Sequence, residues 1–116
     1  MNAIFIESPI FERYRSEYLT DEEYQAFQNE LLNRPKSGDV IKGSGGIRKV
    51  RYSQKNRGKG KRGGIRVIYY WLDSHNRFYL ITLYSKGEIA DLSPNETKSL
   101  KKLVEVWRDE ESKKSI

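Results

Sequence analysis

Cysteine is absent from this chain of 116 residues, and histidine occurs once, at His75. The absence of cysteine excludes disulfide frameworks, thiolate metal sites and cysteine nucleophiles, and it fits a reducing compartment. A single histidine excludes a two-histidine nuclease mechanism. No run approaches the ~18 apolar residues of a membrane span, and the apolar stretch at residues 3–6 is too short for a signal peptide. We therefore expect a cytoplasmic protein that does not contact a membrane.

The length predicts one domain over residues 1–116, with a frayed tail at 110–116. Hydrophobic residues make up only 36% of the chain, but aromatic residues make up 12%. Large aromatic side chains can still build a core. We expect a folded domain.

Acidic residues are missing from the middle of the chain. Residues 1–41 carry eight acids and four bases, residues 42–72 carry ten bases and no acid, and residues 73–116 carry eight of each. The whole net charge of +6 therefore arises in the middle segment. A concentration of cations interleaved with tyrosines is typical of a surface that binds a polyanion.

Local patterns predict the elements. Residues 3–7 read as a strand, Ser8-Pro9 as the start of a first helix, and Thr20 with Glu23 as the capping box of a second. Residues 36–46 hold four glycines and predict a loop. Further strands are expected at 47–53, 65–72 and 78–84, the last two as a hairpin, and a third helix after Ser93. The predicted order, β-α-α-β-β-β-α, is an α+β fold with an antiparallel central sheet and helices packed on it.

The glycine-rich segment at residues 58–63 formally matches a dinucleotide-binding fingerprint. That fingerprint requires a following helix, and here a strand follows, so we reject it. A P-loop is absent from the sequence, and NTPase activity is not expected. Glu88 and Asp91 beside Lys86 favour a salt-bridged turn over a metal site, and His75 favours a solvated turn residue. We predict neither a metal ion nor another cofactor.

The basic residues show a pattern that favours contact with a phosphate backbone over solubility alone. Strand alternation places Lys49 and Arg51 on the face opposite Val50, and Arg66 begins the next strand. The glycines of the intervening loop allow close approach to a phosphate chain. Tyr84, at the end of the last strand, would bring a phenol near the cleft that these basic residues are expected to line. The candidate residues for binding the backbone of an RNA are Arg48, Lys55, Arg57, Lys59, Lys61 and Arg62.

Four segments together resemble the RelE/HigB superfamily of bacterial toxins, and most closely its HigB-like branch. They are residues 18–24, residues 45–51, residues 58–64 with 66–70, and residues 83–88 with 91–92. The resemblance extends from Ile4 to Trp107 and implies a RelE-like compact domain. It also implies that the protein enters the A site of the 70S ribosome and cleaves messenger RNA there. A cognate antitoxin, HigA-like and carrying a helix-turn-helix domain, is implied as the partner.

The resemblance implies that Lys49, Arg51 and Arg66 surround the scissile phosphate. Where RelE-like toxins have an arginine after the lysine and a tyrosine a few residues on, this chain has Gly87 and Leu92. The identity of the general acid therefore stays open, and Tyr84 and Lys86 complete the candidate catalytic set of Lys49, Arg51, Arg66, Lys86 and Tyr84.

RNA cleavage without metal requires that the ribose 2′-OH loses a proton, that the phosphorane oxyanion is stabilised and that the 5′-oxygen gains a proton. Guanidinium groups suit the oxyanion, whereas a lysine crowded by other cations releases its proton more readily and can serve as a base. Lys49 is the first candidate, with Lys59, Lys61 or Lys86 as alternatives for base or donor. A non-catalytic inhibitor of DNA gyrase, of the ParE type, is the second hypothesis, since it shares the fold.

Overall fold

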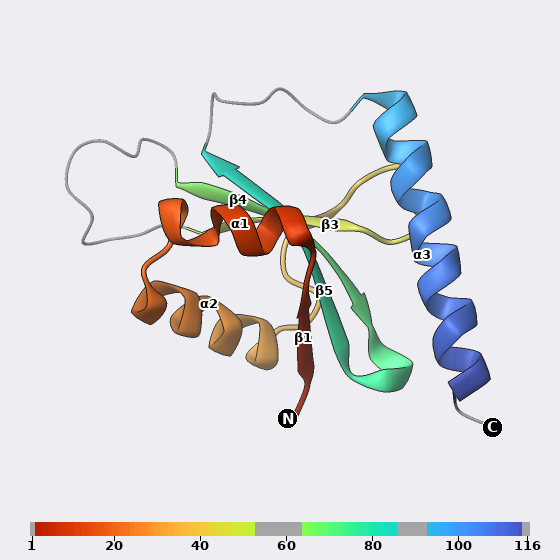
Figure 1. Ribbon diagram of the computed structural model, residues 1–116, viewed down its shortest axis with the longest axis horizontal. Coiled ribbons are helices and arrows are strands. Elements are labelled where there is room, and N and C mark those ends of the chain that lie inside the picture. Colours follow the sequence, from red (N-terminus) through yellow and green to blue (C-terminus); the bar gives the residue numbers. More distant parts are fainter. Residues whose placement is uncertain (1, 53–63, 86–92, 115–116) are drawn as a thin grey trace.

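The computed structural model describes residues 2–52, 64–85 and 93–114. Three α-helices and five strands within them form an α+β architecture, which confirms the predicted fold class (Figure 1). The elements are β1 (Ile4–Glu7), α1 (Pro9–Tyr18), α2 (Asp21–Asn33), β2 (Asp39–Val40), β3 (Arg48–Tyr52), β4 (Ile65–Leu72), the 3₁₀ helix η1 (Asp73–His75), β5 (Arg77–Ser85) and α3 (Pro94–Lys114). None of the described helices is both long enough and apolar enough to cross a membrane.

The strands form one sheet in the order β1-β5-β4-β3-β2. Strands β2 to β5 pair antiparallel, as expected, and β4 and β5 form the predicted hairpin. Its turn is η1, followed by Asn76 in the left-handed conformation (φ 51°), which asparagine tolerates well. Strand β1 adds to β5 in the parallel direction, so the sheet as a whole is mixed.

Two elements differ from the sequence prediction. Strand β2 lies inside the segment expected to be a loop, and α3 continues to Lys114, beyond the residue at which fraying was expected. Gly38 makes the pairing of β2 with β3 possible, because its φ is +83° and a Cβ there would overlap the carbonyl oxygen of Lys49. A two-residue strand has too little sequence pattern of its own to be recognised without its partner.

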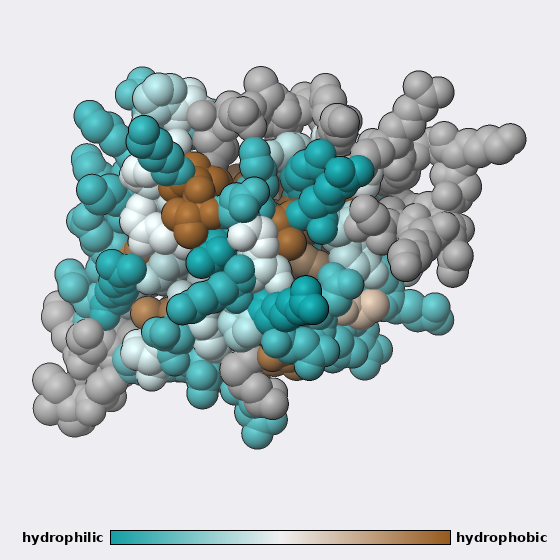
Figure 2. Space-filling model, turned by 180° about the vertical axis from the view of Figure 1, so that it is seen from behind, coloured by the Kyte–Doolittle hydropathy of each residue, from teal (hydrophilic) through white to brown (hydrophobic). Residues whose placement is uncertain are grey.

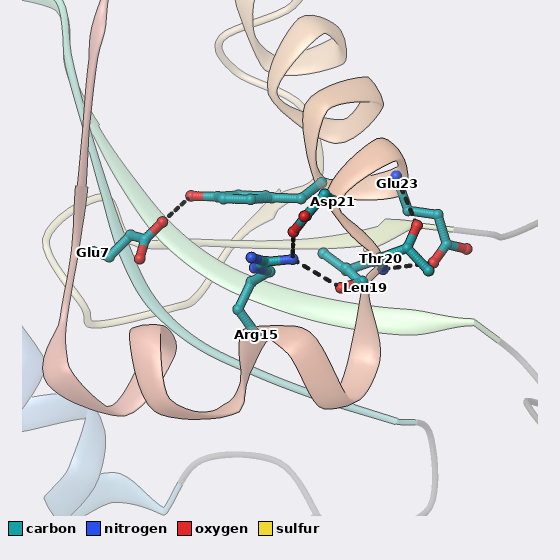
Figure 3. A network of polar contacts seen from close by, with 7 residues as sticks. Glu7, Arg15, Leu19, Thr20, Asp21 and Glu23 are labelled. Carbon is teal, nitrogen blue, oxygen red and sulfur yellow. Dashed lines mark hydrogen bonds and ion pairs between the residues drawn. The ribbon is translucent and has the colours of Figure 1, made fainter.

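The predicted helix starts are confirmed. The Ser8 side chain accepts a hydrogen bond from the backbone N–H of Phe11 at 3.0 Å, and Pro9 occupies the first helical position. At α2, Thr20 and Glu23 form a reciprocal capping box (Figure 3). These caps satisfy backbone donors that a helix start otherwise leaves unpaired.

Polar contacts tie β1, α1 and α2 together (Figure 3). The Tyr24 phenol donates a hydrogen bond to a Glu7 carboxylate oxygen at 2.5 Å, and Arg15 pairs with Asp21 at 2.8 Å. Arg15 also donates to the Leu19 carbonyl at 3.1 Å and lies over the Tyr24 ring. Burial, with the Glu7 contact adding to it, raises the pKa of Tyr24 above its usual value and so favours the protonated phenol that donates this bond.

The sheet has two differently covered faces. Helices α1 and α2 lie over one of them, which we call the closed face; α3 lies against the other, which we call the open face (Figure 1). Buried side chains of the closed face are Phe11, Leu19, Phe27, Leu31, Ile65, Val67, Tyr69, Phe78, Leu80 and Leu83. Those of the open face are Ile47, Ile68, Tyr70, Leu72, Tyr79, Tyr84 and Val104.

Helix α3 packs on the open face through a narrower stripe than its sequence predicts. Val104 is buried, and Leu100 and Trp107 pack partly against the open-face core. The helical spacing of Leu100, Leu103, Val104 and Trp107 in the sequence predicts that all four belong to one apolar stripe, but Leu103 is 40% exposed. Because α3, a helix of 21 residues, contacts the sheet through a narrow stripe of side chains, Leu103, next to the buried Val104, faces solvent.

Candidate functional site

A row of three predicted site residues crosses the open face. Arg51 on β3 lies opposite Arg66 on β4, and Arg66 lies opposite Tyr84 on β5. Directly opposed residues in antiparallel strands project to the same face with Cβ atoms about 5 Å apart. The register therefore places two arginines and a tyrosine in one line across three strands, with their side chains starting from the same face.

A second row runs beside the first. Lys49, two residues before Arg51 on β3, lies opposite Ile68 on β4 and opposite Asp39 on β2. Alternation along the strands places this row on the same face as the first. Lys49 therefore stands next to the arginine row, as the sequence predicts, and a carboxylate stands beside Lys49.

A cleft of about 760 Å³ opens on this face between the sheet and the first half of α3. Its cationic lining residues are Lys42, Lys49, Lys98 and Lys101, and Asp39 also lines it. Ile68 and Tyr84 contribute from the sheet. Seen from the side opposite α1 and α2, hydrophobic residues are visible between hydrophilic ones (Figure 2).

A tight turn builds the rim of the cleft between β2 and β3. The Ser44 hydroxyl is buried, donates to the Ile41 carbonyl at 2.6 Å and accepts from the Ile47 N–H at 3.0 Å. The Ile41 N–H also donates to the Ile47 carbonyl at 2.8 Å. These bonds fix residues 41–47, which carry Lys42, although the glycines of this segment predict only a loop.

Arg48 lies on the closed face, away from the two rows. Its guanidinium donates to the carbonyls of Lys36 and Gly38 at 3.0 and 3.1 Å. Tyr69, opposite Arg48 on β4, donates to the carbonyls of Pro35 and Ser37. Together the two side chains hold the segment that leads into β2, and an RNA-binding role for Arg48 stays a prediction.

Arg51 reaches a different hollow from Lys49. It lines a depression of about 320 Å³ together with Glu30, Asn33 and Arg34 at the end of α2. Arg51 is exposed, whereas Arg66 is half-buried and Tyr84 is only 6% exposed. Arg66 and Tyr84 are therefore the more firmly placed members of the row.

Several predicted site residues lie outside the described part of the chain. They are Lys86 of the catalytic set and Lys55, Arg57, Lys59, Lys61 and Arg62 of the binding set. Glu88 and Asp91 lie outside it as well. Over residues 2–52, 64–85 and 93–114, no three acidic or histidine side chains are grouped as metal ligands would be.

The candidate residues chosen from the sequence did not include four charged residues of the cleft, namely Asp39, Lys42, Lys98 and Lys101. Asp39 was assigned to a loop, so its place opposite Lys49 could not be seen. Lys101 carried a usable signal, because it lies three residues before the buried Val104 and four after the buried Thr97. That spacing puts it beside the packed stripe of the helix.

The arrangement can perform phosphate chemistry. Guanidinium groups donate in a planar fork that matches phosphate oxygens, and ammonium groups add point charges. Lys49 and Asp39 are groups that can exchange a proton, and Tyr84 offers a phenolic O–H. The two rows thus bring anion-binding and proton-transfer groups together on one face of the sheet, where Asp39, Lys49 and Tyr84 line the cleft and the arginine row lies beside it.

No family model matches the chain. Among solved structures, the chain is similar to a double arginine-to-alanine mutant of the E. coli toxin RelE in the free state, with 16% sequence identity. The similarity covers 76% of this chain and 86% of that chain, with a TM-score of 0.50. At this identity the similarity concerns the fold, and the chain accordingly has a RelE-like α+β fold.

Proposed function

We propose that this protein is the toxin of a toxin–antitoxin pair, and that it is a metal-independent endoribonuclease that cleaves messenger RNA in the ribosomal A site. The RelE-like fold supports this proposal, as do the sequence segments that resemble the HigB-like branch. The observation that carries it is the row of Arg51, Arg66 and Tyr84 next to Lys49 on the open face. A scissile phosphate bound at this row would meet donors from three strands.

The proposed reaction is an internal transfer. The ribose 2′-oxygen forms a bond to the adjacent phosphorus, and the bond from phosphorus to the 5′-oxygen breaks. The proton of the 2′-OH passes to a general base, and a general acid protonates the departing 5′-oxygen. The products are a 2′,3′-cyclic phosphate and a 5′-hydroxyl end.

The five candidate catalytic residues have distinct roles in this scheme. Arg66, with Arg51, donates hydrogen bonds to the oxyanion of the phosphorane. Lys49 is the first candidate for the general base, and Tyr84 and Lys86 are candidates for the general acid. Because this set is sparse, positioning of the RNA by the ribosome supplies much of the rate.

The test is primer extension on messenger RNA after brief expression of the protein in bacteria. We expect growth and translation to stop and new 5′ ends to map within codons of translated messages. Intact messenger RNA with arrested DNA replication would contradict the proposal and favour the gyrase inhibitor of the ParE type.

The proposed partner is a cognate antitoxin of the HigA-like kind with a helix-turn-helix domain. The cationic segment at residues 42–72 would attract an acidic arm, and a bulky partner on the helices would block entry into the ribosome. Co-expression with the cognate antitoxin should restore growth. Cleavage by the purified complex that equals cleavage by the free protein would contradict both modes of silencing.

A further inference from the structure

The first half of α3 contributes lysines to the cleft, in addition to the basic residues of the two rows on the sheet. Lys98 and Lys101 line the cleft on the side opposite the sheet, and Lys42 lines its rim. Both α3 lysines are exposed, so their ammonium groups are accessible. The cleft thus has cationic walls on two sides, one from β3 and one from α3.

The α3 wall is held at a fixed distance from the sheet. Trp107 stacks on Tyr79 with ring centroids 4.3 Å apart, and the Arg108 Nε donates to the Tyr70 phenol oxygen at 2.7 Å. Arg108 also donates to the Gly45 carbonyl at 3.3 Å. These contacts anchor the second half of α3 and leave its first half to form the wall.

Gly43 and Gly45 allow the turn between β2 and β3 to lie close against the first half of α3. A Cβ at Gly45 would lie 3.4 Å from the Cγ of Lys101, and a Cβ at Gly43 would lie 3.8 Å from the Cγ2 of Thr97. The aliphatic stem of Lys101 therefore lies against the rim, so its ammonium group is carried at the cleft. This contact orients Lys101 in a way that a lysine in open solvent is not oriented.

The lining suits a nucleotide better than an acidic peptide. Ile68 and Tyr84 offer an apolar surface for a base, and the lysines offer charges for the phosphates on either side of it. The Asp39 carboxylate can accept hydrogen bonds from the amino groups of a base. The volume of about 760 Å³ lies within the range of roughly 300–1,000 Å³ typical of ligand pockets.

We propose that the first half of α3 is a second wall of the RNA site, with Lys98, Lys101 and Lys42 binding the phosphates that flank the scissile one. The assignment rests on the proposed function for the identity of the strand. Single-stranded RNA enters between α3 and β3, with its scissile phosphate at the arginine row and the neighbouring phosphates between the lysines.

The experiment compares Lys101→Glu with Lys102→Glu. The two lysines are adjacent and both exposed, but only Lys101 lines the cleft, so the variants have the same net charge and differ in where it falls. Binding of a short labelled single-stranded RNA is measured by fluorescence anisotropy over a range of salt concentrations. Circular dichroism melting of each variant checks that the fold is retained.

We expect Lys101→Glu to weaken RNA binding by about tenfold or more at low salt and to reduce the log–log salt slope by about 0.7, the value for one phosphate contact on a single strand. At about 0.15 M salt, where exposed charges are largely screened beyond about 8 Å, Lys102→Glu should stay within about twofold of the wild type and bind more tightly than Lys101→Glu, because its charge lies outside the cleft. Equal affinities of the two variants would overturn the proposal. So would wild-type protein that shows no salt-dependent RNA binding, or that binds a polyglutamate peptide more tightly than the RNA at the same salt.

The same variants separate this proposal from the proposed function. If the wild-type protein leaves ribosome-bound messenger RNA intact but binds RNA in a manner that depends on Lys101, the proposed cleavage is wrong and the role of α3 in RNA binding is supported. If the wild-type protein cleaves the message, and both variants are equally active and bind RNA equally well, the proposed cleavage is supported and the role of α3 in RNA binding is wrong.

Discussion

The two faces of the sheet use the same strands for different purposes. On the closed face, two helices cover a continuous aromatic and aliphatic core, and the polar groups there, such as Arg48 and Tyr69, bond to backbone carbonyls. On the open face, one helix covers only part of the sheet, and Lys49 and Tyr84 line a cleft beside it. Alternation thus lets neighbouring residues of one strand serve stability and ligand binding separately. Substitutions on the two faces should therefore have separable effects.

The largest expected effect on activity is that of Arg66→Ala on the open face. Loss of a donor to the transition-state oxyanion typically costs about 3 kcal/mol, so the single-turnover cleavage rate should fall by on the order of a hundredfold or more. The melting temperature should change little. Rapid-quench measurements on ribosome–message complexes give the rate.

Arg57→Ala provides the contrast, since the sequence predicts that Arg57 binds the ribosome or RNA without touching the reacting atoms. It should weaken binding in a salt-dependent way and leave the single-turnover rate at saturation unchanged. If both variants lower that rate equally, the division of roles is wrong.

The largest expected effect on stability is that of Gly38→Ala beside the closed face. The φ of +83° disfavours alanine by more than about 1 kcal/mol, and the added Cβ would overlap the Lys49 carbonyl and lie 2.8 Å from the Cα of Val50. We expect the free energy of unfolding to fall by several kcal/mol, measured by urea denaturation. Gly43→Ala, also at positive φ but with no backbone within 3.4 Å, should cost less.

Features that depend on residues close together in the sequence could be predicted, whereas features that depend on contacts between distant segments could not. The starts of α1 and α2 were predictable because Ser8 and Thr20 bond within their own helix turn. The faces of Lys49 and Arg51 were predictable from alternation alone. Strand β2 was not, because its two residues are defined by pairing with β3. The spacing of Lys101 from Val104 indicates that it lies beside the packed stripe of α3, but its position at the cleft depends on how α3 docks against residues 43–45.

Tyr69→Phe removes one hydroxyl from the closed face and tests whether this face contributes to stability without contributing to cleavage. Its phenol donates to the Ser37 carbonyl at 2.6 Å and to the Pro35 carbonyl at 3.0 Å. We expect a loss of about 1–2 kcal/mol in the free energy of unfolding at neutral pH, because acceptors in a part-buried site lose their donor. Cleavage per folded molecule should be unchanged.

The same variant tests a pH dependence. Burial raises the pKa of Tyr69 from 10.0 to about 12, so the phenol ionises in the unfolded chain at a lower pH than in the folded protein. The stability it contributes is complete below pH 10 and is lost as the pH rises toward 12. Urea denaturation at a series of alkaline pH values should show a smaller decline for Tyr69→Phe than for the wild type. Parallel curves would contradict the assignment.

The smallest expected effect is that of Asp39→Asn, and it concerns the carboxylate opposite Lys49. If Asp39 serves to balance the local charge, its removal eliminates repulsion between a carboxylate and the phosphates, so RNA affinity at low salt should rise by about threefold. This is the outcome we expect, with the single-turnover cleavage rate at saturation within about twofold of the wild type. A role in proton transfer would instead lower that rate by about a hundredfold, the contribution of a positioned acid or base. Anisotropy and rapid-quench cleavage on the same variant distinguish the two, and a fall in rate without a change in affinity would move the general base from Lys49 to Asp39.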